Sequence, residues 1–185
     1  YYHEDLADPD LAGIVRTAAG AFAAVPGKEC HPVVFVDQEG ARAYARWAGK
    51  RLPTEYEWEI AARGVAARAY PWGEEELDDG RANFDFRVGH TTPVGSYPRG
   101  STPEGVHDLA GNVWELVEGS WAAYPWSGAT TEPHTRGPLM RGGSWVTPRS
   151  NLKSTYRDAW KGHSAMVGFR CAMDEKETDE PIRFG

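Results

Sequence analysis

Cysteine is scarce in this chain, and its scarcity excludes two classes of small protein. The 185 residues include only Cys30 and Cys171, which lie far apart and form no Cys-x-x-Cys pair. Thiolate zinc ribbons and disulfide-dense domains need more cysteines at closer spacing. Two arrangements remain open, a single long-range disulfide between Cys30 and Cys171 or two buried free thiols.

Long hydrophobic runs are also missing. No stretch approaches the roughly 18 consecutive apolar residues that cross a bilayer, so we expect no membrane span. The sequence shows neither an initiator methionine nor a signal-peptide pattern, so Tyr1 is either a processed N-terminus or the start of a fragment. We expect the protein to lie outside the cytoplasm, periplasmic or secreted, rather than inside it.

A surplus of positive charge is absent as well. The chain carries 20 Lys and Arg against 27 Asp and Glu, for a formal net charge of −7. The first ten and the last twelve residues supply this whole excess, so the body of the chain is electrically balanced. Without a basic stripe to follow a phosphate backbone, nucleic acid is not an expected partner.

Aromatic residues, glycine and proline are plentiful. The chain has 8 Trp, 8 Tyr and 6 Phe, which argues against disorder along its whole length. It also has 21 Gly and 13 Pro without any repeat, which is typical of a loop-rich domain. We divide it into an acidic, Ala-rich segment (1–30), a main domain (31–173) and an acidic tail (174–185).

Helix and strand signals are clear in only a few places. A helix is predicted over 39–48 after a cap at Asp37, and another over 55–63 after the capping box of Thr54 and Glu57. The second helix should end at Gly64. Strands are predicted at 31–36, 92–97, 140–145 and 168–173, and a short helix is possible before residue 30.

Five motifs occur in a fixed order. They are WAGKRLPTE (47–55), YPWG (70–73), DLAGNVWE (108–115), RGGSW (141–145) and GFRC (168–171). Together they resemble the formylglycine-generating enzyme family, also called the sulfatase-modifying factor domain. The resemblance covers residues 31–173 and implies an α+β, C-type-lectin-like fold with two helices, small twisted sheets and little regular structure. The usual front segment of the family is not recognisable in residues 1–30.

Calcium is the cofactor that both the residues and the resemblance indicate. Asp108 and Glu115 bracket a Gly-Asn turn whose carbonyls can face inward, and calcium takes six to eight oxygen ligands. The resemblance places one calcium site on the side chains of Asp108 and Glu115 and the carbonyls of Gly111 and Val113. It places a second site on Asn83 and the carbonyl of Phe84, in a loop that is shorter here than in the family.

The catalytic positions of the family are not retained. The resemblance implies two copper-binding cysteines after the GGS motif, and the matching positions hold Thr147 and Leu152. Because Cu(I) selects thiolate ligands, formylglycine generation is not expected. Met166 replaces an asparagine that helps to hold the substrate, and Cys171 matches a structural cysteine whose partner position is Ala45. The acids Glu55, Glu57 and Glu59 are interpreted as capping and surface residues.

Three functions remain open. The first is a non-catalytic binding or assembly module, an accessory subunit that packs against another protein chain or an unseen segment of the same polypeptide. The second is an oxidoreductase that needs a partner, either of the formylglycine-generating type or with altered chemistry. The third is a variable ligand-binding protein of the diversity-generating retroelement type, variable over 146–167. The candidate binding residues are Trp121, Tyr124, Trp126, Ser144, Trp145, Tyr156 and Trp160.

Overall fold

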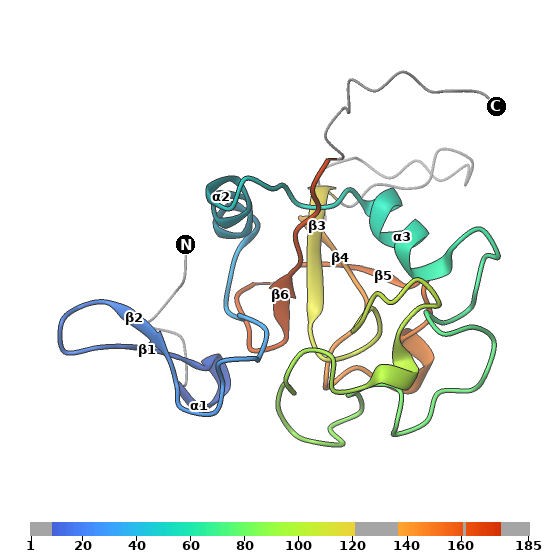
Figure 1. Cartoon of the computed structure of the whole chain (residues 1–185), viewed down its shortest axis with the longest axis horizontal. Helices are drawn as coiled ribbons and strands as arrows, with labels where there is room; N and C mark the ends of the chain where they lie inside the picture. Colours follow the sequence, from blue (N-terminus) through green and yellow to red (C-terminus); the bar gives the residue numbers. More distant parts are fainter. Residues whose placement is uncertain (1–8, 121–136, 161, 175–185) are drawn as a thin grey trace, which may run out of the picture.

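The computed structural model describes residues 9–120, 137–160 and 162–174 of the chain (Figure 1). Its helices are α1 (Pro9–Ala12), α2 (Gln38–Trp47) and α3 (Glu55–Arg63), with 3₁₀ turns η2 (Pro98–Gly100) and η3 (Arg149–Asn151). Its strands are β1 (Ile14–Arg16), β2 (Phe22–Ala24), β3 (Trp114–Ser120), β4 (Pro138–Arg141), β5 (Arg157–Ala159) and β6 (Val167–Phe169). This confirms an α+β domain in which loops make up much of the chain.

A four-stranded sheet forms the centre of the fold. Its strand order is β5-β4-β3-β6, and β6 runs parallel to β3 while the other neighbours are antiparallel. Residues 114–117 of β3 are all buried, as expected for the central strand of a sheet that is covered on both faces. The ladder between β3 and β4 shifts register between Leu116 and Ser120.

Two capped helices pack on this sheet, as the sequence predicts. In α2, the Asp37 side chain accepts a hydrogen bond from Gly40 N, and α3 begins with the complete Thr54–Glu57 capping box and ends at Gly64. Helix α2 contacts β3, and α3 contacts β3 and β4. The buried Gln38 side chain donates hydrogen bonds to the carbonyls of Val117 and Gly119, which fixes α2 against the irregular end of β3.

Two predicted strands need correction. Segment 31–36 is buried over 34–36 but is not a strand, because Phe35 takes a left-handed conformation (φ 57°) and donates its N–H to Ser164 O. Segment 92–97 is a turn-rich loop. Before residue 30, the short helix is α1, which has four residues, and β1 and β2 form a hairpin after it. In Figure 1 this hairpin lies to one side of the sheet.

Candidate functional site

The AGN turn before β3 is built by left-handed backbone. Asp108, Gly111 and Asn112 have φ values of 58°, 77° and 65°. A Cβ on Gly111 would lie 2.3 Å from the carbonyl oxygen of Asn83, so only glycine fits at that position. Asn112 fixes the turn, since its N–H donates to Asn83 O and its side chain exchanges hydrogen bonds with the backbone of Thr92. Two chain segments are thereby locked together behind the site.

Glu115 is the central acid of the site, and both of its oxygens are engaged. Arg170 donates from Nε to Oε2 and from Nη2 to Oε1, each at 2.6 Å. The indole Nε1 of Trp58 donates to Oε2, also at 2.6 Å. Burial opposes the charge of Arg170, but the adjacent Glu115 carboxylate outweighs it and raises the pKa of the guanidinium. Glu115, whose side chain is 6% exposed, is therefore a fully compensated buried carboxylate.

Asp108 and Glu115 line one cavity, which has a volume of about 400 Å³ and is also lined by His107 and Arg170. One oxygen of Asp108 accepts a hydrogen bond from Gly95 N at 2.7 Å. Burial raises the pKa of Asp108, and the nearby Glu115 adds to the rise. The structure thus brings together the two carboxylates that the sequence singled out, and Arg170 lines the same cavity.

The first calcium position does not fit calcium in this arrangement. Calcium would need the Glu115 oxygens, and these are already bound bidentately by a guanidinium and by an indole N–H. A second cation beside Arg170 would also meet like-charge repulsion. No cluster of three or more acidic, histidine or cysteine ligands occurs among the residues described. The Glu115 oxygens are therefore not free to bind a cation.

The second calcium position fits better. The Asn83 side chain donates from Nδ2 to His90 O, yet its buried Oδ1 has no hydrogen-bond partner among the described atoms. Asn83 is 1% exposed, so its oxygen is held without compensation from bulk solvent. The carbonyl of Phe84 accepts from Arg87 N, and the neighbouring Asp85 is exposed. An oxygen ligand is therefore available at Asn83.

The positions that resemble the copper-binding cysteines are closed. Thr147 and Leu152 are 4% and 1% exposed. A Cβ on Gly143 would lie 2.3 Å from Leu152 Cδ2 and 3.3 Å from Thr147 Cγ2, so both side chains pack on the same glycine. The Thr147 hydroxyl accepts from Ser144 N at 2.8 Å and lies 3.1 Å from the Ser144 hydroxyl. The residues present do not fit copper.

An ion-pair network around Arg141 was not foreseen from the sequence. Arg141 is fully buried, and it pairs with Glu59, lies 3.7 Å from Glu55, and donates to the carbonyls of residues 154–156. Glu55 also pairs with Arg157 at 2.7 Å. Glu55 and Glu59 are thus half-buried partners of arginine side chains rather than solvated surface acids. Their four-residue spacing, which puts both on one helix face, was the available signal.

Most of the predicted binding aromatics that the structure describes belong to the core. Trp145 is 8% exposed, and its indole donates to Ala165 O. Tyr156 and Trp160 are half-buried against the core cluster that includes Trp114. Ser144 is fully buried. Trp121, Tyr124 and Trp126 lie outside the described residues. The described aromatics therefore fit the alternative that they build a core poor in aliphatic side chains.

The structure does not support the disulfide alternative. Cys30 and Cys171 are both free, Cys30 exposed and Cys171 half-buried. Burial raises the pKa of the Cys171 thiol, although Lys50 opposes the rise.

The fold and the AGN turn define a sulfatase-modifying-factor type of domain, and comparison with known proteins agrees. Residues 13–175 match the model of the sulfatase-modifying factor enzyme 1-like domain, so the chain belongs to that family. A formylglycine-generating enzyme of Streptomyces coelicolor is 40% identical over 186 residues, covering 86% of this chain and 58% of that protein. The serine/threonine-protein kinase pkn1 of Chlamydia pneumoniae is 40% identical over 185 residues, covering 94% of this chain but 29% of the kinase.

Two solved structures share the fold. PvdO from Pseudomonas aeruginosa superimposes with a TM-score of 0.60 at 30% identity, covering 76% of this chain and 60% of PvdO. Variable protein 1 of Treponema denticola has a TM-score of 0.67 at 20% identity, covering 87% of this chain and 78% of that protein, which shows the fold alone. The chain spans less than two thirds of the length of the Streptomyces coelicolor enzyme and of the Chlamydia pneumoniae kinase.

We expect Arg170→Ala to destabilise the protein strongly. The substitution leaves Glu115 buried without its counter-ion, a change that costs roughly 3–5 kcal/mol. Arg87→Ala is the matched control, because the Arg87–Asp79 pair at 2.7 Å is exposed and should contribute about 0–1 kcal/mol. Chemical denaturation of both variants measures the difference. Equal losses in the two variants would show that Glu115 does not depend on Arg170.

Asp108→Asn should stabilise the protein at neutral pH. Because the folded pKa of Asp108 is raised, the native state binds more protons than the unfolded state between the unfolded and folded pKa values. The free energy of unfolding should therefore fall as pH rises through that window, and the asparagine variant should lack this fall. Asp79→Asn, at an exposed position, is the control. Lower stability of Asp108→Asn at pH 7 in metal-free buffer would show instead that the site needs the negative charge.

Proposed function

We propose that this chain is a non-catalytic member of its family that acts as a binding or assembly module, as an accessory subunit does. The supporting observation is the packing at the former copper position, where Thr147 and Leu152 are buried against Gly143. A hydroxyl and an isobutyl group replace two thiolates, so no redox centre can form from these side chains. What remains is a rigid loop scaffold, which is suited to holding a partner.

The test is copper-dependent oxidation of a cysteine-containing peptide. We expect the purified chain to consume no oxygen with such a peptide and to bind no Cu(I) at this position. The double variant Thr147→Cys with Leu152→Cys should gain Cu(I) binding, because both positions face the same glycine. Ser150→Cys with Lys153→Cys, at exposed positions, controls for added thiols. Peptide oxidation by the wild-type chain would overturn the proposal in favour of an enzyme.

The two alternative functions have less support in the described residues. An oxidoreductase with altered chemistry would need reactive groups from a partner, since Ser144 is buried and bound to Thr147. A variable ligand-binding protein would need segment 146–167 to tolerate change. Within it, Ser154 is 1% exposed and Arg157 pairs with Glu55, so part of the segment supports the core. The fold likeness to a variable protein does not offset this.

We also propose that calcium binds at Asn83 rather than at Glu115. The unpartnered Asn83 oxygen supports this position, whereas Arg170 opposes the other. Calcium should raise the melting temperature and EDTA should reverse the rise, because a ligand of the native state stabilises it. Asn83→Asp should keep the response and Asn83→Leu should lose it. An unchanged response in Asn83→Leu, or no response in the wild type, would refute the proposal.

The proposed calcium site also bears on the location of the protein. No helix in the described part of the chain is long and apolar enough to cross a membrane. We propose a periplasmic or secreted location, because calcium sites in extracellular modules work at the high calcium concentrations found there. Fractionation of cells that carry the native gene, with antibodies to this domain, tests the proposal.

A further inference from the structure

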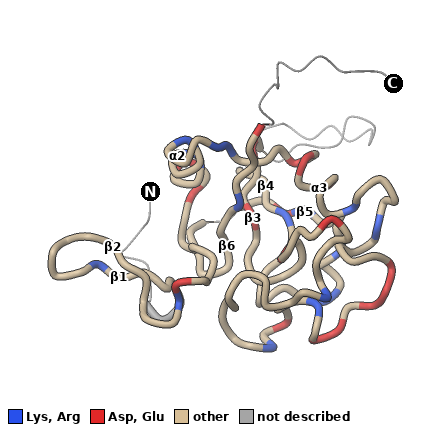
Figure 2. Tube along the Cα trace, in the orientation of Figure 1, with Lys and Arg blue, Asp and Glu red and all other residues tan. Residues whose placement is uncertain are grey.

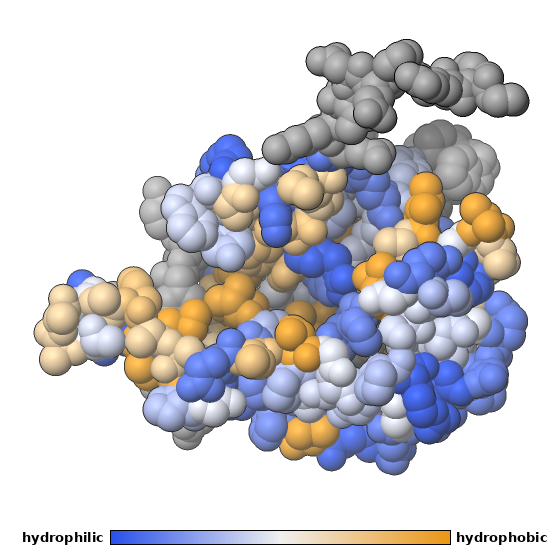
Figure 3. All heavy atoms as spheres, viewed as in Figure 1, coloured by the Kyte–Doolittle hydropathy of each residue, from blue (hydrophilic) through white to orange (hydrophobic). Residues whose placement is uncertain are grey.

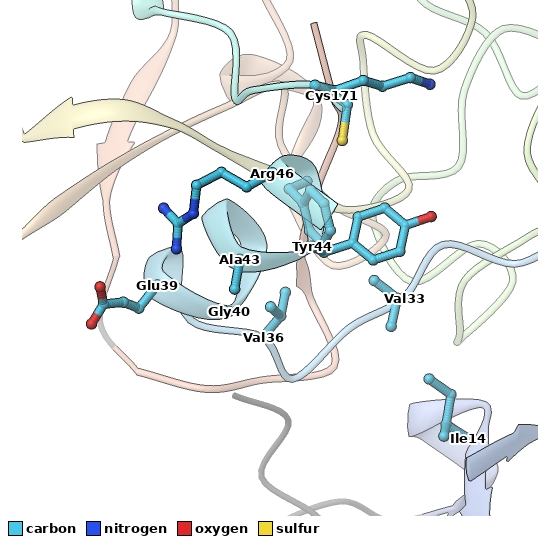
Figure 4. A pocket seen from close by; sticks show the side chains of 11 residues that line it. Ile14, Val33, Val36, Glu39, Gly40, Ala43, Tyr44, Arg46 and Cys171 are labelled. Atoms are coloured by element: carbon cyan, nitrogen blue, oxygen red, sulfur yellow. The ribbon is translucent and has the colours of Figure 1, made fainter. Parts of the chain in front are cut away.

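A groove with a volume of about 960 Å³ opens between the β1–β2 hairpin, α2 and the end of β6. Its apolar wall comes from these three elements and from the loop before α2, and it includes Ile14, Val33, Val36, Ala43, Tyr44 and Phe169. Figure 3 shows hydrophobic residues gathered between the hairpin and α2, where the surface is hollowed. Figure 4 shows Ile14 across the groove from Tyr44, with the Cys171 thiol directed toward α2. The groove is separate from the closed Thr147–Leu152 position.

Aromatic side chains extend the groove along the outer face of α2. Tyr44 packs edge-on against Phe169 with ring centroids 5.6 Å apart, and Trp47 lies 5.6 Å from Tyr44 on the other side. Tyr44 and Trp47 are 52% and 81% exposed. Large exposed aromatic side chains that adjoin an apolar hollow are typical of protein recognition surfaces.

The edge strand beside the groove favours an extended occupant. Phe169 belongs to β6, which is an edge strand of the four-stranded sheet. A polypeptide segment in the groove would lie beside this edge, where a strand can be added to a sheet through main-chain hydrogen bonds. Side chains that alternate along such a strand would place every second residue against Tyr44 and the apolar wall.

The charge around the groove favours an acidic occupant. Arg46 and Lys50 line it and Glu39 is its one acidic lining residue, although the chain as a whole carries −7. Two other arginines of this region are already paired, Arg42 with Glu118 and Arg51 with Glu57. Figure 2 shows Lys and Arg positions in blue along α2 and the loop that follows it. A cationic rim on an acidic protein attracts carboxylates and disfavours basic segments.

We propose that this groove binds an extended segment of another protein, one that alternates apolar and acidic side chains. The inference rests on the proposed role as a binding or assembly module, and it assigns that role a surface and a partner chemistry. A second copy of this chain is less suitable, because each copy carries a net charge of −7 and the two repel.

The two cysteines allow a direct test on the 185-residue chain. Cys171 lines the groove, whereas Cys30 is exposed outside its lining. The probe is an octapeptide of alternating valine and glutamate, compared with the same peptide carrying lysine in place of glutamate. We expect the glutamate peptide to slow maleimide alkylation of Cys171 and to leave that of Cys30 unchanged. The lysine peptide should protect neither thiol.

Matched variants locate the contact. Tyr44→Asp should abolish protection, while Tyr56→Asp should not, since Tyr56 is similarly exposed (55%) but lies on α3. Lys50→Glu reverses the charge of one residue that lines the groove and should weaken peptide binding about tenfold, or about 1.4 kcal/mol. Lys153→Glu should leave the affinity unchanged. Fluorescence anisotropy of the labelled peptide measures the affinity, and circular dichroism verifies that each variant is folded.

Several results would overturn the inference. They are equal protection by both peptides, equal effects of the two tyrosine variants, or no protection of Cys171 at peptide saturation. Protection of Cys171 that grows with protein concentration, with a doubled native mass, would assign the groove to a second copy. Because the oxygen and Cu(I) measurements do not involve the groove, failure here leaves the non-catalytic assignment standing.

Discussion

The rest of this fold depends on the ion pairs of the buried Arg141 guanidinium with Glu59 and Glu55. The guanidinium sits where β4 ends, under α3, and it contacts Glu59, Glu55 and the face of the Trp58 ring, 5.2 Å from its centroid. Trp58 in turn donates to Glu115 at the start of β3. Helix, sheet and AGN turn are therefore connected through one chain of charged and polar contacts. Removing one residue of a buried ion pair lowers the free energy of unfolding strongly, because the charge of the other residue is left buried without a counter-ion.

This network also explains how a chain with so few regular elements holds a fixed shape. The strands other than β3 have three or four residues each, too few to stabilise a sheet by their own ladders. Side chains that cap loops, such as Asn112 on Thr92 and Arg170 on Glu115, supply the remaining order. The carboxylate of Glu115 is neutralised by Arg170 of the same chain, so the turn needs no metal ion to balance this charge.

The sequence predicted what is local and missed what is distant. The ends of α2 and α3 followed from Asp37, the Thr54–Glu57 box and Gly64, because each cap acts within a few residues. Motifs also predicted that Asp108 and Glu115 would meet, and both line one cavity. Sequence patterns could not predict that Arg170 pairs with Glu115, because the two residues lie 55 positions apart. Segment 31–36 failed for the same reason, since its Phe35 N–H is fixed by Ser164 rather than by a neighbouring strand.

The parallel pairing of β6 with β3 decides when the central sheet can be completed during synthesis. Trp114 of β3 pairs with Val167, and Arg51 forms a two-way backbone bridge with Ala172. The helices and β3 are synthesised well before β6, so one side of the central strand stays unpaired in the nascent domain until β6 has emerged. Long-range pairing of this kind slows folding and exposes apolar surface in the interval. The interval between the synthesis of β3 and that of β6 is therefore the stage at which a chaperone would contribute most.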